Sequence, residues 1–318
     1  MGPQKRAEEL SEALRVAGLW EAYADGDGED GDGNGIGKGP GVVLVGHSFG
    51  GTLVRAFLLY TLTRRGHQQN PSLRVAGLVL VDSMTSYPHS LDPPTSMAML
   101  PGMGSSPAEY RTITGLEEHH VFSAEEYAAI VTASDNDEGR KTGEREAGLV
   151  VSGTDEINKA LGLDGDAQGT KKVDLQEHEN ESENDDKKAE AAASASAATM
   201  LDPSARLGAI FCGAHYDFAK IVAHYRRTGR PEDVPCSDEE FAAAVSEVGE
   251  WTEMWAGEEE SNKRRVLSLA KEGMSRFTIA EGNARTHNVQ WVDPDLIVRE
   301  VLWVVGGSEG AEVGVTGK

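Results

Sequence analysis

The chain has 318 residues, enough for one large domain or two small ones, and 39% of them are apolar. Its 53 acidic and 30 basic residues give a formal net charge of −23, which argues against nucleic acid and anionic membrane surfaces as partners. The two cysteines, Cys212 and Cys236, provide neither a disulfide framework nor the spacing of a metal site. We therefore expect no metal ion and no other cofactor.

Residues 1–22 predict a charged amphipathic helix, because Leu10 and Leu14 recur at helical spacing. This segment lacks the apolar core of a signal peptide, and no apolar run in the chain is long enough to span a membrane. We therefore expect a cytoplasmic protein without a membrane span. The sequence leaves its oligomeric state open.

Three stretches lack the large apolar side chains that would offset the entropy lost on folding. Residues 23–41 alternate glycine with acidic residues and predict a linker. Residues 163–200 are acidic and then rich in Ala and Ser, which predicts a disordered insertion. Residues 306–318 predict a flexible tail. The linker and the insertion carry much of the acidic excess, so the net charge says little about a functional site.

The remaining chain alternates short apolar runs with segments of helical spacing. Strands are expected at 42–46, 73–83, 206–213 and 275–282, and helices at 50–64 and 293–305. The strands are apolar without alternation, which predicts an α/β fold with a mostly parallel sheet between helices. Core segments are expected at 42–85 and 201–305, with a helical cap or lid inserted at 86–162. Residues 239–274 predict one or two helices, with Trp251 and Trp255 in the core.

A serine lies between the first of these strands and its helix, in the motif Gly46-His47-Ser48-Phe49-Gly50. A G-x-S-x-G motif at a strand-to-helix turn is typical of a nucleophile elbow, which lifts the serine hydroxyl above the sheet. Gly46 and Gly50 have no Cβ, so strand and helix can approach closely. The backbone N–H of Phe49 is a candidate oxyanion donor. His47 is expected to point away, as a packing or rim residue.

Residues 41–84 resemble the fifth and sixth strands of an α/β-hydrolase around its nucleophile elbow. Residues 275–305 resemble that family's last strand, histidine loop and final helix. The resemblance implies a hydrolase with a catalytic triad in the chain order serine, acid, histidine.

Ser48 is the expected nucleophile, and His287 is the expected base because it follows the last strand in a loop before the final helix. Two residues are candidates for the acid that orients the histidine. Asp82 ends the strand next to the nucleophile strand, and we favour it. Asp217 follows the next strand and remains the alternative. A purely structural explanation for Asp217 is that it is an acidic residue at the N-terminus of a helix. His215 could line the same mouth and is given no role.

If helix 1–22 precedes the nucleophile strand, nothing in the chain corresponds to the family's first four strands. Those strands carry the loop with the second oxyanion donor, whose loss costs about 2.7–4 kcal/mol of transition-state stabilisation. We therefore expect a truncated or degenerate chain with weak or no activity as it stands. The expected substrate is a small apolar ester, because the Pro- and Met-rich start of the cap favours an apolar rim over the serine. A non-catalytic binding protein on the same scaffold is the alternative.

Overall fold

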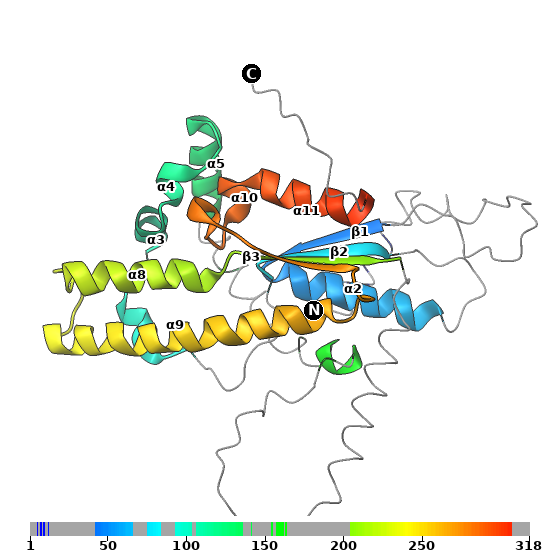
Figure 1. Ribbon diagram of the computed structural model, residues 1–318. Helices are drawn as coiled ribbons and strands as arrows, with labels where there is room; N and C mark the ends of the chain where they lie inside the picture. The colour runs from blue at the N-terminus through cyan, green and yellow to red at the C-terminus, as the bar shows by residue number, and fades with distance from the viewer. Residues whose placement is uncertain are drawn as a thin grey trace, which may run out of the picture.

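The computed structural model describes the sheet, the helices around it and part of the segment 86–162 (Figure 1). The described residues are 42–65, 75–83, 93–103, 106–135 and 204–306, together with 5, 7, 9, 12, 141, 154, 157–161 and 163. The expected linker at 23–41, insertion at 163–200 and tail at 306–318 fall almost wholly outside them, as does most of the helix at 1–22. Those expectations stay predictions.

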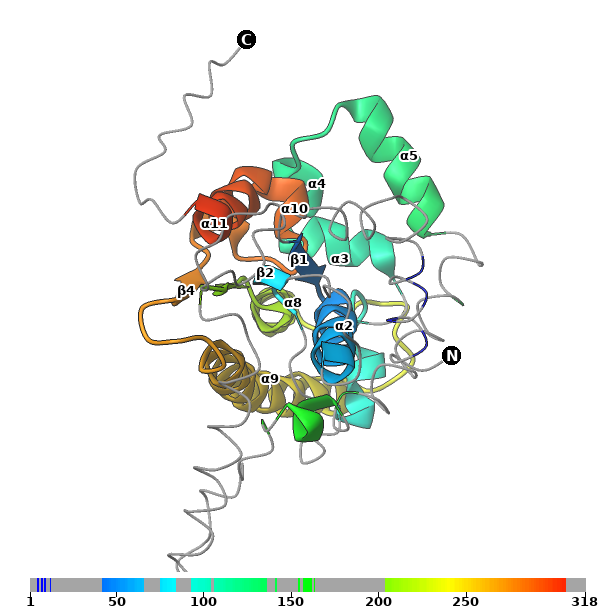
Figure 2. The same cartoon turned by 90° about the vertical axis from the view of Figure 1, so that its right-hand side faces the viewer.

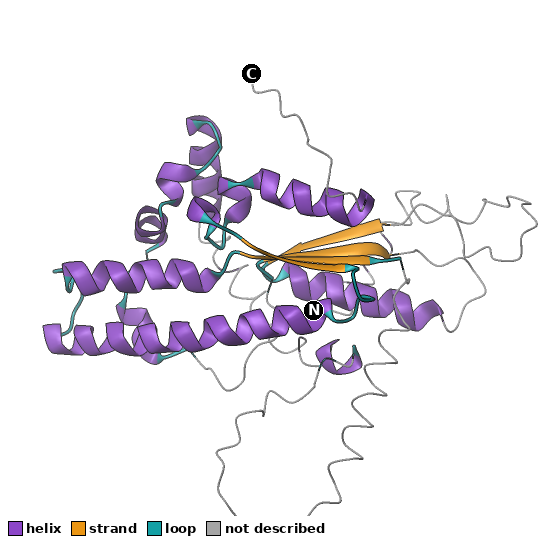
Figure 3. Ribbon diagram, in the orientation of Figure 1, coloured by secondary structure: helices purple, strands orange, loops and turns teal. Residues whose placement is uncertain are grey.

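Four parallel strands form one sheet in the described part of the chain (Figure 3). They are β1 (Val42–His47), β2 (Val75–Val81), β3 (Arg206–Phe211) and β4 (Ser275–Ile279), in the same order in space as in the sequence. The register aligns Leu44 with Leu78 and Leu78 with Leu207. β2 and β3 are buried along almost their whole length, so the expected α/β class with a mostly parallel sheet is confirmed.

β2, β3 and β4 end earlier than the apolar runs predict. The run expected at 73–83 leaves the sheet after Val81, because Asp82 has a φ of 41°, which no extended strand adopts. The run expected at 206–213 leaves it after Phe211. The residues beyond each strand therefore turn out over the carboxyl edge of the sheet, where the candidate site forms.

Helices cover both faces of the sheet (Figure 2). They are α2 (Gly50–Arg65), α9 (Asp238–Leu267) and α11 (Pro294–Gly306), with α8 (Ala214–Thr228) leading away from β3. α2 and α9 pack on one face, where Phe57 and Leu78 belong to one buried cluster. α11 packs on the other face, where Val79 and Val304 belong to a second cluster. The segment expected to hold one or two helices is a single helix, α9, which begins at a capping box.

Further helices lie between β2 and β3 in the sequence and at the carboxyl end of the sheet in space (Figure 1). They are η2 (Thr95–Met99), α3 (Pro107–Thr114), α4 (Leu116–His119) and α5 (Ala124–Ser134). α5 begins at a capping box in which Ser123 accepts from the Glu126 N–H and Glu126 accepts from the Ser123 N–H. α3 packs on α8, and α4 packs on α10 (Val289–Val292). This part of the chain therefore borders the residues that follow the strands.

Candidate active site

Ser48 lies at the sharp turn between β1 and α2, with a φ of 51°. A positive φ is unfavourable for a residue with a Cβ, and backbone hydrogen bonds hold this one in place. The Ser48 N–H donates to the Val81 carbonyl over 3.2 Å, and the Gly51 N–H donates to the Ser48 carbonyl over 3.0 Å. α2 begins at Gly50, so the positive end of its dipole lies beside the serine.

The glycines around this turn differ in what they allow. A Cβ on Gly46 would lie 2.7 Å from the Gly50 carbonyl oxygen, so only glycine fits there. A Cβ on Gly50 would meet nothing within 4 Å among the described residues, so the expectation that Gly50 permits the close approach is wrong. Gly51 has that role instead, because a Cβ there would overlap the Ser83 side chain, whose hydroxyl donates to the Gly46 carbonyl. The start of α2 is thus in close contact with the end of β1 at Gly46 and with the residues after β2 at Gly51.

Ser48, His287 and Asp82 form a chain of hydrogen bonds across three loops. The Ser48 Oγ lies 2.9 Å from His287 Nε2, and His287 Nδ1 lies 2.7 Å from Asp82 Oδ2. His287 lies between η3 (Gly282–Ala284) and α10, after the carboxyl end of β4. The imidazole can therefore donate from Nδ1 to the carboxylate while Nε2 accepts the serine hydroxyl proton.

Asp82 is buried, and hydrogen bonds hold both its carboxylate and its backbone. Its Oδ1 accepts the Gly213 N–H over 2.7 Å, and its own N–H donates to the Ile210 carbonyl over 2.9 Å. Burial by itself would raise the pKa of Asp82, but the hydrogen bond and charge of His287, with Lys263 nearby, lower it to about 2. The carboxylate is therefore ionised at neutral pH, as a group that orients a histidine must be.

Asp217, the alternative acid, contacts the backbone of His287 and not its ring. It lies in the first turn of α8 and is fully buried. Its Oδ2 accepts the His287 N–H over 2.8 Å, the Tyr110 hydroxyl over 2.8 Å and the Thr286 hydroxyl over 2.9 Å. Burial raises the pKa of Asp217, against these hydrogen bonds and the nearby Lys220. Asp217 therefore fixes the loop that carries His287.

His47 lies against His287, although the sequence predicts that it points away. The Nε2–H of His47 donates to the His287 carbonyl over 2.7 Å, and the two ring centroids are 4.7 Å apart. Burial lowers the pKa of His47, and the neighbouring His287 lowers it further. His47 thus holds the His287 carbonyl, while Asp217 holds the N–H of the same residue.

The model of the alpha/beta hydrolase family matches residues 2–155 of the chain. The match covers just under half of the chain and supports an alpha/beta-hydrolase-like family. The matched part contains Ser48 and Asp82, whereas His287 lies beyond it. Neither the curated proteins nor the solved structures with which we compared the chain gave a match. The scaffold is therefore of the hydrolase type.

A cavity of about 230 Å³ borders Ser48, Asp82 and His287. Its walls are largely aromatic and are formed by Phe49, Tyr110, Phe211, Phe218 and Trp255. They come from the turn after β1, from α3, β3, α8 and α9, so the cavity forms only when these elements pack together. Such walls suit an apolar group of a substrate.

Several residues of this cavity have no role in the sequence-based prediction. Trp255 borders the cavity, so the expectation that it is a core residue is wrong; its ring stacks on Trp251 with centroids 5.1 Å apart. His215, in the first turn of α8, lines the cavity as the sequence-based prediction allowed, although it was given no role there. The methionines of the expected apolar rim, Met97, Met99 and Met103, pack instead against the buried cluster of α8 and α9.

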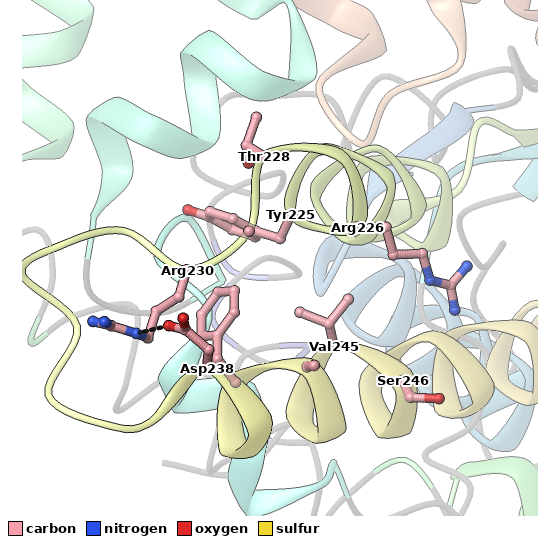
Figure 4. Close-up of a pocket in the computed structure, with 10 residues that line it drawn as sticks. Tyr225, Arg226, Thr228, Arg230, Asp238, Val245 and Ser246 are labelled. Atoms are coloured by element: carbon pink, nitrogen blue, oxygen red, sulfur yellow. Dashed lines mark hydrogen bonds and ion pairs between the residues drawn. The ribbon is translucent and has the colours of Figure 1, made fainter.

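A second hollow, of about 490 Å³, lies between the end of α8 and the start of α9 (Figure 4). Tyr225 and Val245 face it, and Arg230 forms an ion pair of 2.7 Å with Asp238 at its rim. It shares no residue with the cavity at Ser48. It lies at the ends of α8 and α9 that are far from Ser48.

Within the described ranges, no group of three or more His, Cys, Asp or Glu side chains is arranged to hold a metal ion. Cys212 is buried, and burial raises the pKa of its thiol, which makes it a poor nucleophile or metal ligand. The described helices also include none that is long and apolar enough to cross a membrane.

Proposed function

We propose that this α/β-hydrolase is a serine hydrolase that cleaves small esters through an acyl-enzyme on Ser48. The observation that supports this most is the pair of hydrogen bonds that joins Ser48 Oγ, His287 and Asp82, at 2.9 and 2.7 Å. A serine hydroxyl is a weak nucleophile unless a base takes its proton, and this arrangement supplies the base and the group that orients it.

In the first half of the reaction, Ser48 Oγ attacks the ester carbonyl carbon while its proton passes to His287 Nε2. The Asp82 carboxylate stabilises the imidazolium that forms. The carbonyl oxygen becomes an oxyanion next to the Phe49 N–H, for which the described residues contain no acceptor. The imidazolium then protonates the leaving alkoxide, and the C–O bond to the alcohol breaks. The acyl group remains on Ser48.

In the second half, His287 takes a proton from a water molecule, which attacks the acyl carbon. The tetrahedral intermediate collapses, the bond to Ser48 Oγ breaks, and the serine regains its proton from His287. The aromatic cavity beside Ser48 would hold an apolar acyl or alkyl group during both steps. Asp217 and His47 hold the histidine loop and do not touch the reacting atoms.

A fluorophosphonate probe tests the proposal, because it reacts with an activated serine and not with an ordinary one. The purified chain should be labelled, and Ser48→Ala should abolish both labelling and hydrolysis of p-nitrophenyl butyrate. Ser246→Ala is the matched control, because Ser246 is exposed on α9 and borders the other hollow. A folded protein that neither reacts with the probe nor hydrolyses the ester would overturn the proposal and favour a non-catalytic binding protein.

A further inference from the structure

We propose that Glu259 and Lys263 form a subsite that binds a hydroxyl group on the part of the substrate that enters the cavity beside Ser48. The substrate would then be a hydroxylated ester and not a purely apolar one. This inference rests on the proposed function only in taking the bound molecule to be the substrate of Ser48.

Glu259 and Lys263 are a buried ion pair on α9. Their side chains lie one helical turn apart, with Lys263 Nζ 2.6 Å from Glu259 Oε2. The two residues are 4% and 2% exposed, yet both border the cavity that also contains Ser48 and His287. A charged pair therefore faces the substrate cavity from within the protein.

The pair has unused hydrogen-bonding capacity. Glu259 Oε1 is buried and has no hydrogen-bond partner among the described residues. Lys263 has three N–H donors, and Glu259 is its one hydrogen-bonding partner within the described ranges, with the Phe211 ring 5.1 Å from Nζ. An acceptor and donors thus lie side by side at one cavity wall.

A hydroxyl group is the simplest group that matches both the Glu259 acceptor and the Lys263 donors, because it donates one hydrogen bond and accepts another. It can donate to Glu259 Oε1 and accept from Lys263 Nζ. A carboxylate on the substrate has no proton to donate to Glu259. An ammonium group has no lone pair with which to accept a hydrogen bond from Lys263. An alkyl group would leave Oε1 without a donor, and a buried charged acceptor without a partner is costly.

Against the effect of burial, Lys263 lowers the pKa of Asp82 and Glu259 raises the pKa of Arg55, but folding stability is a weak reason for placing the pair at a cavity. Replacing a buried ion pair with apolar side chains of similar volume is often neutral or stabilising, so such a pair is a weak contributor to folding. One residue further along the same helix, Glu260 and Arg264 form an exposed ion pair at the same spacing that does not border the cavity of Ser48. Comparing variants of the two pairs therefore separates what depends on the cavity from what depends on an ion pair on α9.

The size of the cavity limits the substrate. Its 230 Å³ is below the roughly 300–1,000 Å³ typical of ligand pockets, so a small substrate group fits best. The aromatic side chains Tyr110, Phe218 and Trp255 line the same space as the ion pair. The substrate group that fits is therefore a short alkyl chain that carries one hydroxyl.

Ligand binding tests the subsite without requiring catalysis. The Ser48→Ala protein is titrated with α,ω-diols of four to eight carbons, each paired with the 1-alkanol in which a methyl group replaces one hydroxyl, and binding is followed by ligand-observed NMR. At one chain length or more, the diol should bind about tenfold more tightly than its alkanol, as expected for a hydrogen bond to a charged group. Alkanols that bind at least as tightly as the diols at every length overturn the subsite.

A double variant and a matched control locate the effect. Glu259→Met with Lys263→Met removes both charges without leaving either unpaired, and it should reverse the preference in favour of the alkanol. Glu260→Met with Arg264→Met should keep the preference for the diol. A preference that survives in the Glu259/Lys263 variant would also overturn the subsite.

Hydrolysis separates this inference from the proposed function. Wild-type protein should cleave ethyl 6-hydroxyhexanoate with a kcat/KM about tenfold above that for ethyl heptanoate. Cleavage of both esters without a preference, together with no preference for the diol, overturns the subsite and leaves the serine hydrolase intact. A preference for the diol without cleavage of any ester supports the subsite and counts against the serine hydrolase.

Discussion

The Asp217 carboxylate binds the backbone N–H of His287 at 2.8 Å, while the imidazole of His287 binds Asp82 at 2.7 Å. One histidine therefore contacts two buried carboxylates through different atoms. Asp82 can orient the ring and stabilise its positive charge, whereas Asp217 can only fix the loop on which the ring is mounted. The two carboxylates should differ in what their loss does to the reaction.

Replacing each carboxylate with its amide tests this difference. Asp82→Asn should lower kcat by about 10³–10⁴-fold, because the histidine loses the partner that selects its tautomer. Asp217→Asn should lower kcat by about 10–100-fold, because the loop is held less firmly and the ring is misplaced by a fraction of an ångström. Steady-state kinetics on p-nitrophenyl butyrate measures both. A larger loss in a folded Asp217→Asn protein would show that the roles are reversed.

Removing the Tyr110 hydroxyl should loosen the same loop from the side of α3. This hydroxyl donates to Asp217 over 2.8 Å and accepts from Asn288 Nδ2 over 3.2 Å. Tyr110→Phe should lower the free energy of unfolding by about 1–2 kcal/mol, because a buried carboxylate loses a donor. Urea unfolding measures this, and Tyr216→Phe is the control, because the Tyr216 hydroxyl has no partner among the described residues. Equal effects of the two variants would contradict the prediction.

The two glycines of the elbow motif should respond differently to alanine. Gly46→Ala places a Cβ against the backbone of Gly50, so we expect a loss of about 1–3 kcal/mol in stability and of most probe labelling at Ser48. Gly50→Ala has open space among the described residues and should change stability by less than about 0.5 kcal/mol. Thermal unfolding and labelling rates measure both variants. An inactive Gly50→Ala protein would mean that the turn needs glycine there for another reason.

Stability should depend on the protonation of His215. Burial lowers the pKa of His215 from 6.5 to about 4, although Asp82 and Glu260 oppose the shift. Between these values the unfolded chain binds a proton at this residue and the folded protein does not. The free energy of unfolding therefore falls as the pH drops from about 6.5 to about 4, and this contribution is constant below that range.

His215→Phe isolates that contribution, because it keeps a ring beside Phe211 but cannot take up a proton. Over the same pH range, the difference in unfolding free energy between the variant and the wild type should change by about 3 kcal/mol in favour of the variant. Urea unfolding at several pH values measures it. Two stability curves that stay parallel from pH 7 to pH 4 would contradict the prediction.

Much of the site could be predicted from local patterns. The motif around Ser48 predicts its turn because strand, glycines and helix follow one another directly along the chain. The candidates His287 and Asp82 came from the resemblance to the α/β-hydrolase family, which implies a histidine after the last strand and allows an acid at the end of the strand next to the nucleophile. Gly50 shows the limit of such a pattern, because the close contact it was expected to permit belongs to Gly51 and Ser83.

The sequence by itself determined the parallel sheet, the elbow and the two candidate acids, because apolar periodicity and turn chemistry act over a few neighbouring residues. Only the tertiary structure decided that Asp82 meets the ring of His287 while Asp217 meets its backbone. It alone also brought the Glu259–Lys263 pair to the cavity of Ser48. These contacts join segments far apart along the chain, and whether they form depends on how helices and strands pack, a property that no local pattern of residues contains.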